Sequence, residues 1–132
     1  MSTVSVYADF STGPIASTTP VVAPEMDEAG VEYDLSRYPH YKVQCEMLVR
    51  DAFPNRHLIV RPGLIVGPGD PSDRLTYWVE RAMRPGPILA PAPAERRVRF
   101  SDVRDLAAWM VAVAEAGDAG TFNAVGPAGR LS

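Results

Sequence analysis

The stretch of sequence that decides the fold is residues 37–61, RYPHYKVQCEMLVRDAFPNRHLIVR. Residues 37–53 are predicted to form a helix that ends before Pro54, because proline cannot continue helical hydrogen bonding. The residues that recur at helical spacing along one side are Tyr38, Lys42, Cys45 and Val49. Residues 57–61 are typical of a buried parallel strand. With a short strand expected at residues 2–7, the order strand, helix, strand predicts a βαβ unit and a parallel sheet.

Outward from this stretch, the sequence alternates loops with further helices and strands. Ser36 is expected to cap the helix at residues 37–53, where Pro39 is tolerated because it falls in the first turn. The later helices are expected at residues 74–84, capped by Asp73, and from the Ser101 cap to Ala116, ended by Gly117. The other expected strands are residues 86–90, 97–100 and 121–125, and the expected loops are residues 8–30 and 62–73.

The bulk composition limits the classes of partner that we expect. The 132-residue chain carries a net charge of -3, which argues against nucleic acid or an anionic membrane surface as a partner. No apolar run reaches membrane-spanning length, and no signal peptide is recognisable. The single cysteine, Cys45, cannot form an internal disulfide, which fits a reducing compartment. We therefore expect a cytoplasmic protein with no nucleic-acid and no membrane partner.

Tyr38 and Lys42 form the pair of residues that most suggests chemistry. Lys42 is the only lysine among the 13 basic residues, and residues four apart on a helix are neighbours on its surface. An ammonium group beside a phenol favours the phenolate and lowers the phenol pKa from about 10, so such a tyrosine can exchange a proton with a hydroxyl or carbonyl group. The alternative is a surface aromatic–cation pair that only stabilises the helix. The spacing alone leaves both interpretations open.

Five blocks of sequence place this pair in a wider pattern. They are STVSVY (residues 2–7), YPHYKVQCE (38–46), RPGLIVGPG (61–69), FSDVRDLA (100–107) and FNAVG (122–126). In this order and spacing they resemble the extended short-chain dehydrogenase/reductase family, the group of NAD-dependent epimerases and dehydratases. The resemblance covers nearly the whole chain. It implies an α/β fold, with a partial Rossmann-type parallel sheet and part of a small C-terminal substrate-binding region.

The resemblance also assigns roles by position. Thr3, which lies four residues before Tyr7, is implied to hydrogen-bond the substrate oxygen. Tyr38 is implied to be the catalytic acid/base, and Lys42 its partner. The residues implied to bind the nicotinamide cofactor, NAD or NADP, are Tyr38, Lys42, Pro62, Gly63 and Val66. The implied reaction is hydride transfer between a substrate carbon and nicotinamide C4, coupled to proton transfer through Tyr38.

The region that would bind the cofactor pyrophosphate departs from the family pattern. Family members open with a strand and a G-x-x-G-x-x-G turn at a helix N-terminus, and these 132 residues contain no such turn. Met1 stands where the family usually has an apolar strand residue. We therefore expect a fragment that begins at an internal valine codon read as a start. An upstream reading frame without a glycine-rich turn would contradict this expectation.

A second departure concerns the substrate. Nucleotide-sugar epimerases of the family usually place an arginine two residues before the aromatic residue of the F-x-x-V-x-D block, and that position is Val98 here. A nucleotide sugar is therefore less favoured, and a small carbonyl or sterol-like substrate of a reductase is more favoured. The candidate substrate-binding residues are Trp78 and Arg97, although the arginines around residue 97 also fit a solvated edge.

Other reactive side chains have structural explanations. His40 and His57 are the only histidines, and without a cysteine or carboxylate at ligand spacing we expect no metal site. Cys45 is expected to be a small, buried hydrophobic residue. Asp102 and Asp105 fall in the first turn of a helix, where carboxylates interact favourably with the helix dipole.

These expectations combine into a chain of two parts. Residues 1–66 are expected to be the C-terminal part of a dinucleotide-binding Rossmann domain that carries the catalytic helix. Residues 67–132 are expected to be a partial substrate-binding region, whose helix at residues 102–116 packs back on the first part. The expected activity is that of an NAD(P)-dependent epimerase, dehydratase or reductase acting on a small molecule, with the catalytic helix as the surface for a homodimer. The alternative is a catalytically silent, truncated remnant.

Overall fold

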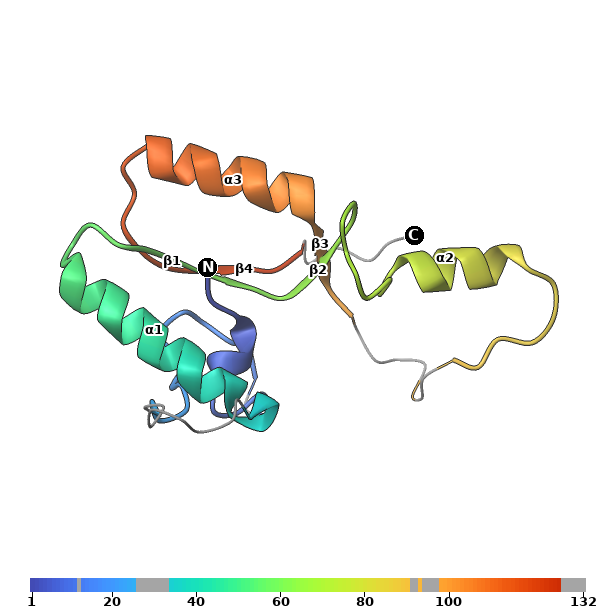
Figure 1. The fold of residues 1–132 in the computed structure, drawn as a ribbon, viewed down its shortest axis with the longest axis horizontal. Helices are drawn as coiled ribbons and strands as arrows, with labels where there is room; N and C mark the ends of the chain where they lie inside the picture. Colours follow the sequence, from blue (N-terminus) through green and yellow to red (C-terminus); the bar gives the residue numbers. More distant parts are fainter. Residues whose placement is uncertain (12, 26–33, 91–92, 94–97, 127–132) are drawn as a thin grey trace.

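The computed structural model describes residues 1–11, 13–25, 34–90, 93 and 98–126. At its centre, β1 (Leu58–Pro62) pairs in parallel with β4 (Gly120–Ala124). Helices α1 (Tyr38–Ala52) and α3 (Val103–Glu115) lie on opposite sides of this pair of strands (Figure 1). Parallel strands that are connected through helices define an α/β architecture. The predicted α/β, partial Rossmann-like fold is therefore confirmed.

Helix α1 occupies the predicted residues, but its start is built differently. The predicted cap, Ser36, is wrong, because Ser36 lies within a 3₁₀ turn, η2 (Leu35–Arg37), that runs directly into α1. The carboxylate of Asp34 caps this turn by accepting a hydrogen bond from the Ser36 amide at 2.8 Å. Pro39 lies in the first turn of α1, as predicted, where its missing N–H removes no helical hydrogen bond.

The strand predicted at residues 2–7 is wrong. Residues Val4–Val6 form a 3₁₀ turn, η1, because the Thr3 hydroxyl accepts a hydrogen bond from the Ser5 amide at 3.2 Å. A local bond between a side chain and the backbone competes with strand pairing. The segment still joins the sheet, because the Ser2 amide donates to the Val60 carbonyl at 2.7 Å. The chain therefore leaves the sheet at the point where η1 begins.

The core lies on both sides of the β1–β4 pair. Its buried apolar side chains are Val6, Tyr7, Val43, Ile59, Val60, Val66 and Leu106. On the α3 side, the Trp109 ring packs edge to face on the Phe122 ring of β4, with 6.0 Å between the ring centroids. Helix α3 therefore covers the face of the strand pair opposite α1. No helix within the described ranges is both long enough and apolar enough to cross a membrane.

A second small sheet follows directly from the first. β2 (Leu64–Val66) begins after Gly63 and pairs in parallel with β3 (Phe100–Asp102). The loop predicted over residues 62–73 is therefore wrong at β2, and the strand predicted at residues 86–90 is irregular. In place of the strand predicted at residues 97–100, the structure has β3, which begins at the last of these residues. The first predicted residue, Arg97, lies outside the described part of the chain. The division of the chain at residue 66 stays a prediction.

The caps of the two later helices also differ from prediction. Helix α2 (Thr76–Met83) projects away from the β1–β4 pair (Figure 1) and has no side-chain cap. The predicted cap Asp73 has a φ of 50°. Helix α3 is capped by Asp102 instead of Ser101, because the Asp102 carboxylate accepts from the Arg104 amide at 2.8 Å. Its end at Gly117, with a φ of 74°, is as predicted.

Candidate active site

A cleft of about 500 Å³ opens at the carboxyl end of β1. In α/β folds, ligands bind outside the carboxyl ends of parallel strands. The cleft is lined by η1 and the residues before it, by the start of α1, and by the connection from β1 to β2. The structure thereby brings four of the predicted site residues to one cleft. They are Thr3, Tyr38, Pro62 and Gly63.

Tyr38 is held at the first position of α1. Its backbone N–H donates to the Leu35 carbonyl, which closes the η2 turn and fixes the direction in which α1 begins. The side chain is half-buried. Among the described residues, the Tyr38 hydroxyl has no hydrogen-bond partner. A ligand in the cleft can therefore bind the phenol without displacing an existing bond.

Lys42 lies one turn further along α1 and points to a neighbouring space. Its Nζ donates to the Met1 carbonyl at 2.9 Å. The residue lines a cavity of about 60 Å³ beside the cleft, together with Ser2 and Cys45. An ammonium group has three donors, so the bond to Met1 leaves two of them available. The structure thus places Lys42 next to the Tyr38 cleft but outside its lining.

Thr3 combines a structural contact with a position in the cleft. Its hydroxyl accepts from the Ser5 amide and donates to the Ser5 Oγ, both at 3.2 Å. A hydroxyl hydrogen rotates freely to suit its acceptor. Thr3 can therefore redirect its proton from Ser5 to an oxygen in the cleft while it still caps η1.

The three remaining predicted residues are not at this cleft. Val66 is buried and pairs in register with Asp102 of β3. Trp78 lies on α2, 39% exposed, where its ring packs edge to face on Tyr77 at 5.2 Å between centroids. Arg97 lies outside the described residues. The position of Trp78 follows from α2, which the structure directs away from the sheet.

Cys45 and the histidines lie at the periphery of α1 and β1. Cys45 is exposed, so its predicted burial is wrong: the buried face of α1 is that of Val43 and Glu46. His40 is half-buried, and its Nδ1 lies 2.7 Å from the Ala23 carbonyl oxygen. Within the part of the chain that the structure describes, no three or more side chains of metal-ligating type come together.

A second cavity, of about 490 Å³, lies between α3 and the end of β4. Its lining includes the apolar residues Trp109 and Leu106 and the acidic residues Asp102 and Asp105. The side-chain and backbone N–H groups of Arg104 lower the pKa of Asp102 to about 2, so this carboxylate is ionised at neutral pH. Two carboxylates disfavour a phosphate-bearing ligand through charge repulsion. The cleft at Tyr38 is therefore the better candidate for a dinucleotide.

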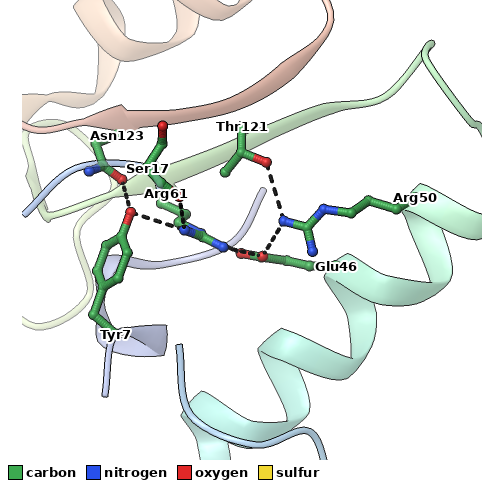
Figure 2. Close-up of polar contacts among 7 residues, drawn as sticks. All are labelled: Tyr7, Ser17, Glu46, Arg50, Arg61, Thr121 and Asn123. Carbon is green, nitrogen blue, oxygen red and sulfur yellow. Dashed lines mark hydrogen bonds and ion pairs between the residues drawn. The ribbon is translucent and has the colours of Figure 1, made fainter. Parts of the chain in front are cut away.

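A buried polar cluster lies beside the cleft and was not predicted (Figure 2). Arg61 of β1 donates from Nε to Glu46 Oε1 at 2.8 Å and from Nη2 to Glu46 Oε2 at 2.6 Å. Its Nη1 donates to the Tyr7 hydroxyl at 3.0 Å, and that hydroxyl donates to Asn123 Oδ1 at 2.5 Å. Arg61, Glu46 and Tyr7 are all at least 97% buried. The signal in the sequence was a charged residue, Arg61, at the end of an apolar strand.

The ion pair fixes the charges in this cluster. Burial alone raises the pKa of Glu46, but the hydrogen bonds and charge of Arg61 and the charge of Arg50 outweigh burial and lower that pKa. The same pairing raises the pKa of Arg61. Arg50, which is half-buried, adds a contact from Nη2 to Glu46 Oε2 at 3.0 Å. Both members of the central pair are therefore ionised at neutral pH.

Comparison with known proteins identifies the family. A sequence model of the NAD dependent epimerase/dehydratase family matches residues 1–125. Searches among curated proteins and among solved structures gave no match. The matched range includes η1, α1, both strands of the central pair and all the residues that line the cleft at the carboxyl end of β1. Members of this family depend on a nicotinamide cofactor and have oxidoreductase- or epimerase-type activity. The chain belongs to the NAD dependent epimerase/dehydratase family.

Proposed function

We propose that this chain carries the proton-transfer site of an NAD(P)-dependent oxidoreductase, epimerase or dehydratase, with Tyr38 as the acid/base. The observation that carries the proposal is that Thr3 and Tyr38, which lie 35 positions apart in the sequence, line one cleft at the carboxyl end of β1. Hydroxyl groups from two elements that face the same space can hold one substrate oxygen between them.

The residues around the cleft fit the nicotinamide riboside end of the cofactor. When bound, the nicotinamide supplies or accepts a hydride. The Tyr38 phenol would give its proton to the substrate oxygen during carbonyl reduction, and Thr3 would hydrogen-bond the same oxygen. Lys42 would hold ribose hydroxyls with the donors that it does not use on Met1. Pro62 and Gly63 would form the wall beside the ring.

The lining of the cleft favours a small, neutral carbonyl or sterol-like substrate. Among the described residues that line it, Arg74 has the one charged side chain, and its Nε already donates to the Ser72 hydroxyl at 2.6 Å. Val4 and Leu64 add apolar surface, as does the neighbouring Ile65. Val98, in place of an arginine, offers no group to bind a diphosphate. These features support a reductase of neutral ketones over an enzyme for nucleotide sugars.

Oxidation of NADH and NADPH by the purified chain tests this proposal. We expect turnover with small neutral ketones or sterol ketones and little with nucleotide sugars. Tyr38→Phe should lower turnover at least about 100-fold, because a general acid contributes about 10²–10⁴. Tyr77→Phe, on the exposed face of α2, is the matched control and should leave turnover unchanged. A Tyr38→Phe variant as active as the wild type would refute the acid/base role.

The second candidate, a catalytically silent remnant, is favoured by the absence of a G-x-x-G-x-x-G turn from these 132 residues. Thermal unfolding separates the two candidates. A ligand that binds the native state must raise the unfolding midpoint. We expect millimolar NAD or NADP to raise it, and no shift with either cofactor would favour the silent remnant.

We also propose that α1 is the surface of a homodimer. Helix α1 and its C-cap Phe53 carry four exposed large apolar side chains among the described residues, which are Met47, Leu48, Val49 and Phe53, at 40%, 58%, 39% and 55% exposure. A helix face of this kind is a frequent protein–protein contact. The proposal commits to a second copy of this chain, related by twofold symmetry, as the partner.

A further inference from the structure

We propose that Arg61, Glu46, Tyr7 and Asn123 form a positioning cluster that holds the segments of the candidate cleft in a fixed relation to one another. This inference rests on the proposed function of the cleft. None of the four side chains lines the cleft itself. They are therefore positioning residues, which act through the residues that do.

Each segment that carries a proposed site residue also carries one member of the cluster (Figure 2). Tyr7 follows Thr3 by four residues, at the end of η1. Glu46 lies on α1, one helical turn beyond Lys42. Arg61 directly precedes Pro62 in β1. Three segments that are separate in the sequence therefore meet at a single guanidinium group.

The geometry of that guanidinium makes the meeting point rigid. Its five N–H donors lie in one plane at fixed angles. Nε and Nη2 engage both carboxylate oxygens of Glu46, at 2.8 and 2.6 Å, and Nη1 engages the Tyr7 hydroxyl at 3.0 Å. The guanidinium carbon also lies 4.9 Å from the Tyr7 ring centroid. Moving α1 or η1 relative to β1 would therefore break a charge-assisted or buried hydrogen bond.

The cluster also includes the neighbouring strand and a covering loop. Arg61 and Asn123 are register partners in the β1–β4 pair, and the Tyr7 hydroxyl connects them. Arg61 Nη1 donates to the Ser17 carbonyl at 3.1 Å, and Asn123 Nδ2 donates to the Ile15 carbonyl at 3.3 Å. The backbone at residues 15–17 is thereby tied to the carboxyl ends of both strands.

A role in positioning explains this cluster better than a role in stability alone. Buried ion pairs are often no more stabilising than apolar residues of the same volume. The cluster instead supplies directional hydrogen bonds, which fix the orientation of the segments that carry them. The Tyr7 hydroxyl, for example, accepts a hydrogen bond from Arg61 and donates one to Asn123. An apolar replacement would fill the volume without fixing the angle between α1, η1 and β1.

Amide hydrogen exchange of the full chain, without cofactor, tests the inference. Tyr7→Phe removes one hydroxyl and keeps the ring, so the fold should survive. We expect exchange of the Ser2 and Val22 amides, which bond to Val60 and Val6, to become at least about tenfold faster, the change expected for one lost hydrogen bond. The Ala116 amide at the end of α3 should exchange at its wild-type rate.

Two further variants separate geometry from charge and from stability. Arg61→Lys keeps the charge but loses the planar fork, so it should accelerate exchange at Ser2 and Val22 as Tyr7→Phe does. Glu80→Gln alters the exposed pair with Arg84 on α2, and its exchange should match the wild type. Acceleration spread evenly over α3 and the cleft segments, or wild-type exchange in Arg61→Lys, would overturn the inference.

A turnover measurement connects the cluster to the cleft. In a chain that is active, Tyr7→Phe should lower kcat per folded molecule at least about fivefold, because the reacting groups lose alignment. A merely structural cluster would leave turnover per folded molecule unchanged, and that result also overturns the inference. Failure of the proposed function has a different signature, since cofactor would then give neither binding nor turnover in the wild type while local exchange still responds to Tyr7→Phe.

Discussion

Replacement of Glu46 by glutamine removes a buried negative charge and leaves its shape. The substitution leaves the Arg61 guanidinium without the carboxylate that neutralises it. This cation stays buried, because the Arg61 and Glu46 side chains are only 3% and 2% exposed in the wild type. Water cannot compensate at that depth. We therefore expect Glu46→Gln to be among the most destabilising single polar substitutions in this chain.

The structure allows the size of the effect to be worked out. Glu46 accepts two hydrogen bonds from Arg61, and charge-assisted bonds contribute about 1.5–3 kcal/mol each, or about 3–6 kcal/mol together. The glutamine oxygen recovers about 1 kcal/mol. The contact with Arg50 adds little, because the Arg50 side chain is 35% exposed. The expected loss in free energy of unfolding is about 3 kcal/mol, in line with the cost of breaking buried pairs.

Urea unfolding followed by circular dichroism at pH 7 measures this loss. A loss of about 3 kcal/mol corresponds to a fall in the thermal midpoint of about 12 °C for a chain of this length. Glu80→Gln is the matched control, because it makes the same change in a pair whose side chains are 71% and 60% exposed. It should change the free energy by less than about 0.5 kcal/mol. Equal losses in the two variants would refute the reasoning.

The difference in free energy of unfolding between the wild type and Glu46→Gln should also depend on pH. The pKa of Glu46 is lower in the folded chain than its ordinary value of 4.5. A group of this kind stabilises the fold fully above its unfolded-state pKa, and the contribution is lost as the pH falls through the folded-state pKa. The difference should therefore be constant from pH 7 to about pH 5 and shrink at lower pH. If the difference in free energy of unfolding persisted unchanged into strong acid, that result would contradict the conclusion that Glu46 and Arg61 form an ionised pair.

Three further predictions concern the core, a helix cap and the assembly. Val60→Ala, at a side chain only 1% exposed, should lower the free energy of urea unfolding by about 2 kcal/mol; a loss under about 0.5 kcal/mol would argue against its central position. Asp102→Ala removes the cap of α3 and should lower the thermal midpoint at pH 7, and this difference from wild type should shrink as the pH falls from the ordinary aspartate pKa of 3.8 to the folded-state Asp102 pKa of about 2. Leu48→Glu should convert a dimer to a monomer in light scattering, and an unchanged mass would exclude α1 as the interface.

Strong periodic patterns made the central elements predictable from sequence. The helical spacing of Tyr38 and Lys42 predicts α1, and the apolar run at residues 58–60 predicts β1. Both patterns reflect burial of one face over several turns or residues. Short elements are harder to predict, because a single local hydrogen bond can decide whether the segment forms a strand or a turn. The bond between Thr3 and Ser5 turns an apparent strand into η1, and nothing in the alternation of residues 2–7 reveals it.

The predictions of the capping residues Ser36 and Ser101 were wrong for a related reason. Ser36 follows Asp34 closely, and Ser101 precedes Asp102 directly. In each case both residues are good capping types. In the structure Asp34 caps η2, which leads into α1, and Asp102 caps α3, and each carboxylate lies 2.8 Å from the amide nitrogen that donates to it. Capping propensity alone does not choose between two candidates so close in sequence, since the choice depends on the backbone direction at the start of the helix.

In the candidate site, too, contacts between residues far apart in the sequence could not be predicted from local patterns. Spacing predicted that Tyr38 and Lys42 are neighbours, but the bond from Lys42 to the Met1 carbonyl joins residues 41 positions apart. The bond between Tyr7 and Asn123 joins residues 116 positions apart. Contacts of this kind depend on how segments that are distant in the sequence pack against one another. Sequence patterns in single segments therefore revealed the proposed acid/base but not the cluster that holds its surroundings.

Chemical-shift mapping of the ¹⁵N-labelled chain during titration with NAD and NADP tests most directly whether the cleft at Tyr38 receives a nicotinamide cofactor. We expect saturable shifts in residues 2–7, 38–42 and 62–65, which carry the proposed site, and smaller shifts in Lys42→Met and Tyr38→Phe. Shifts that instead gather around Trp109 and Asp105, at the cavity between α3 and β4, would contradict the assignment of the cleft. An absence of saturable shifts with either cofactor would contradict cofactor binding by this chain.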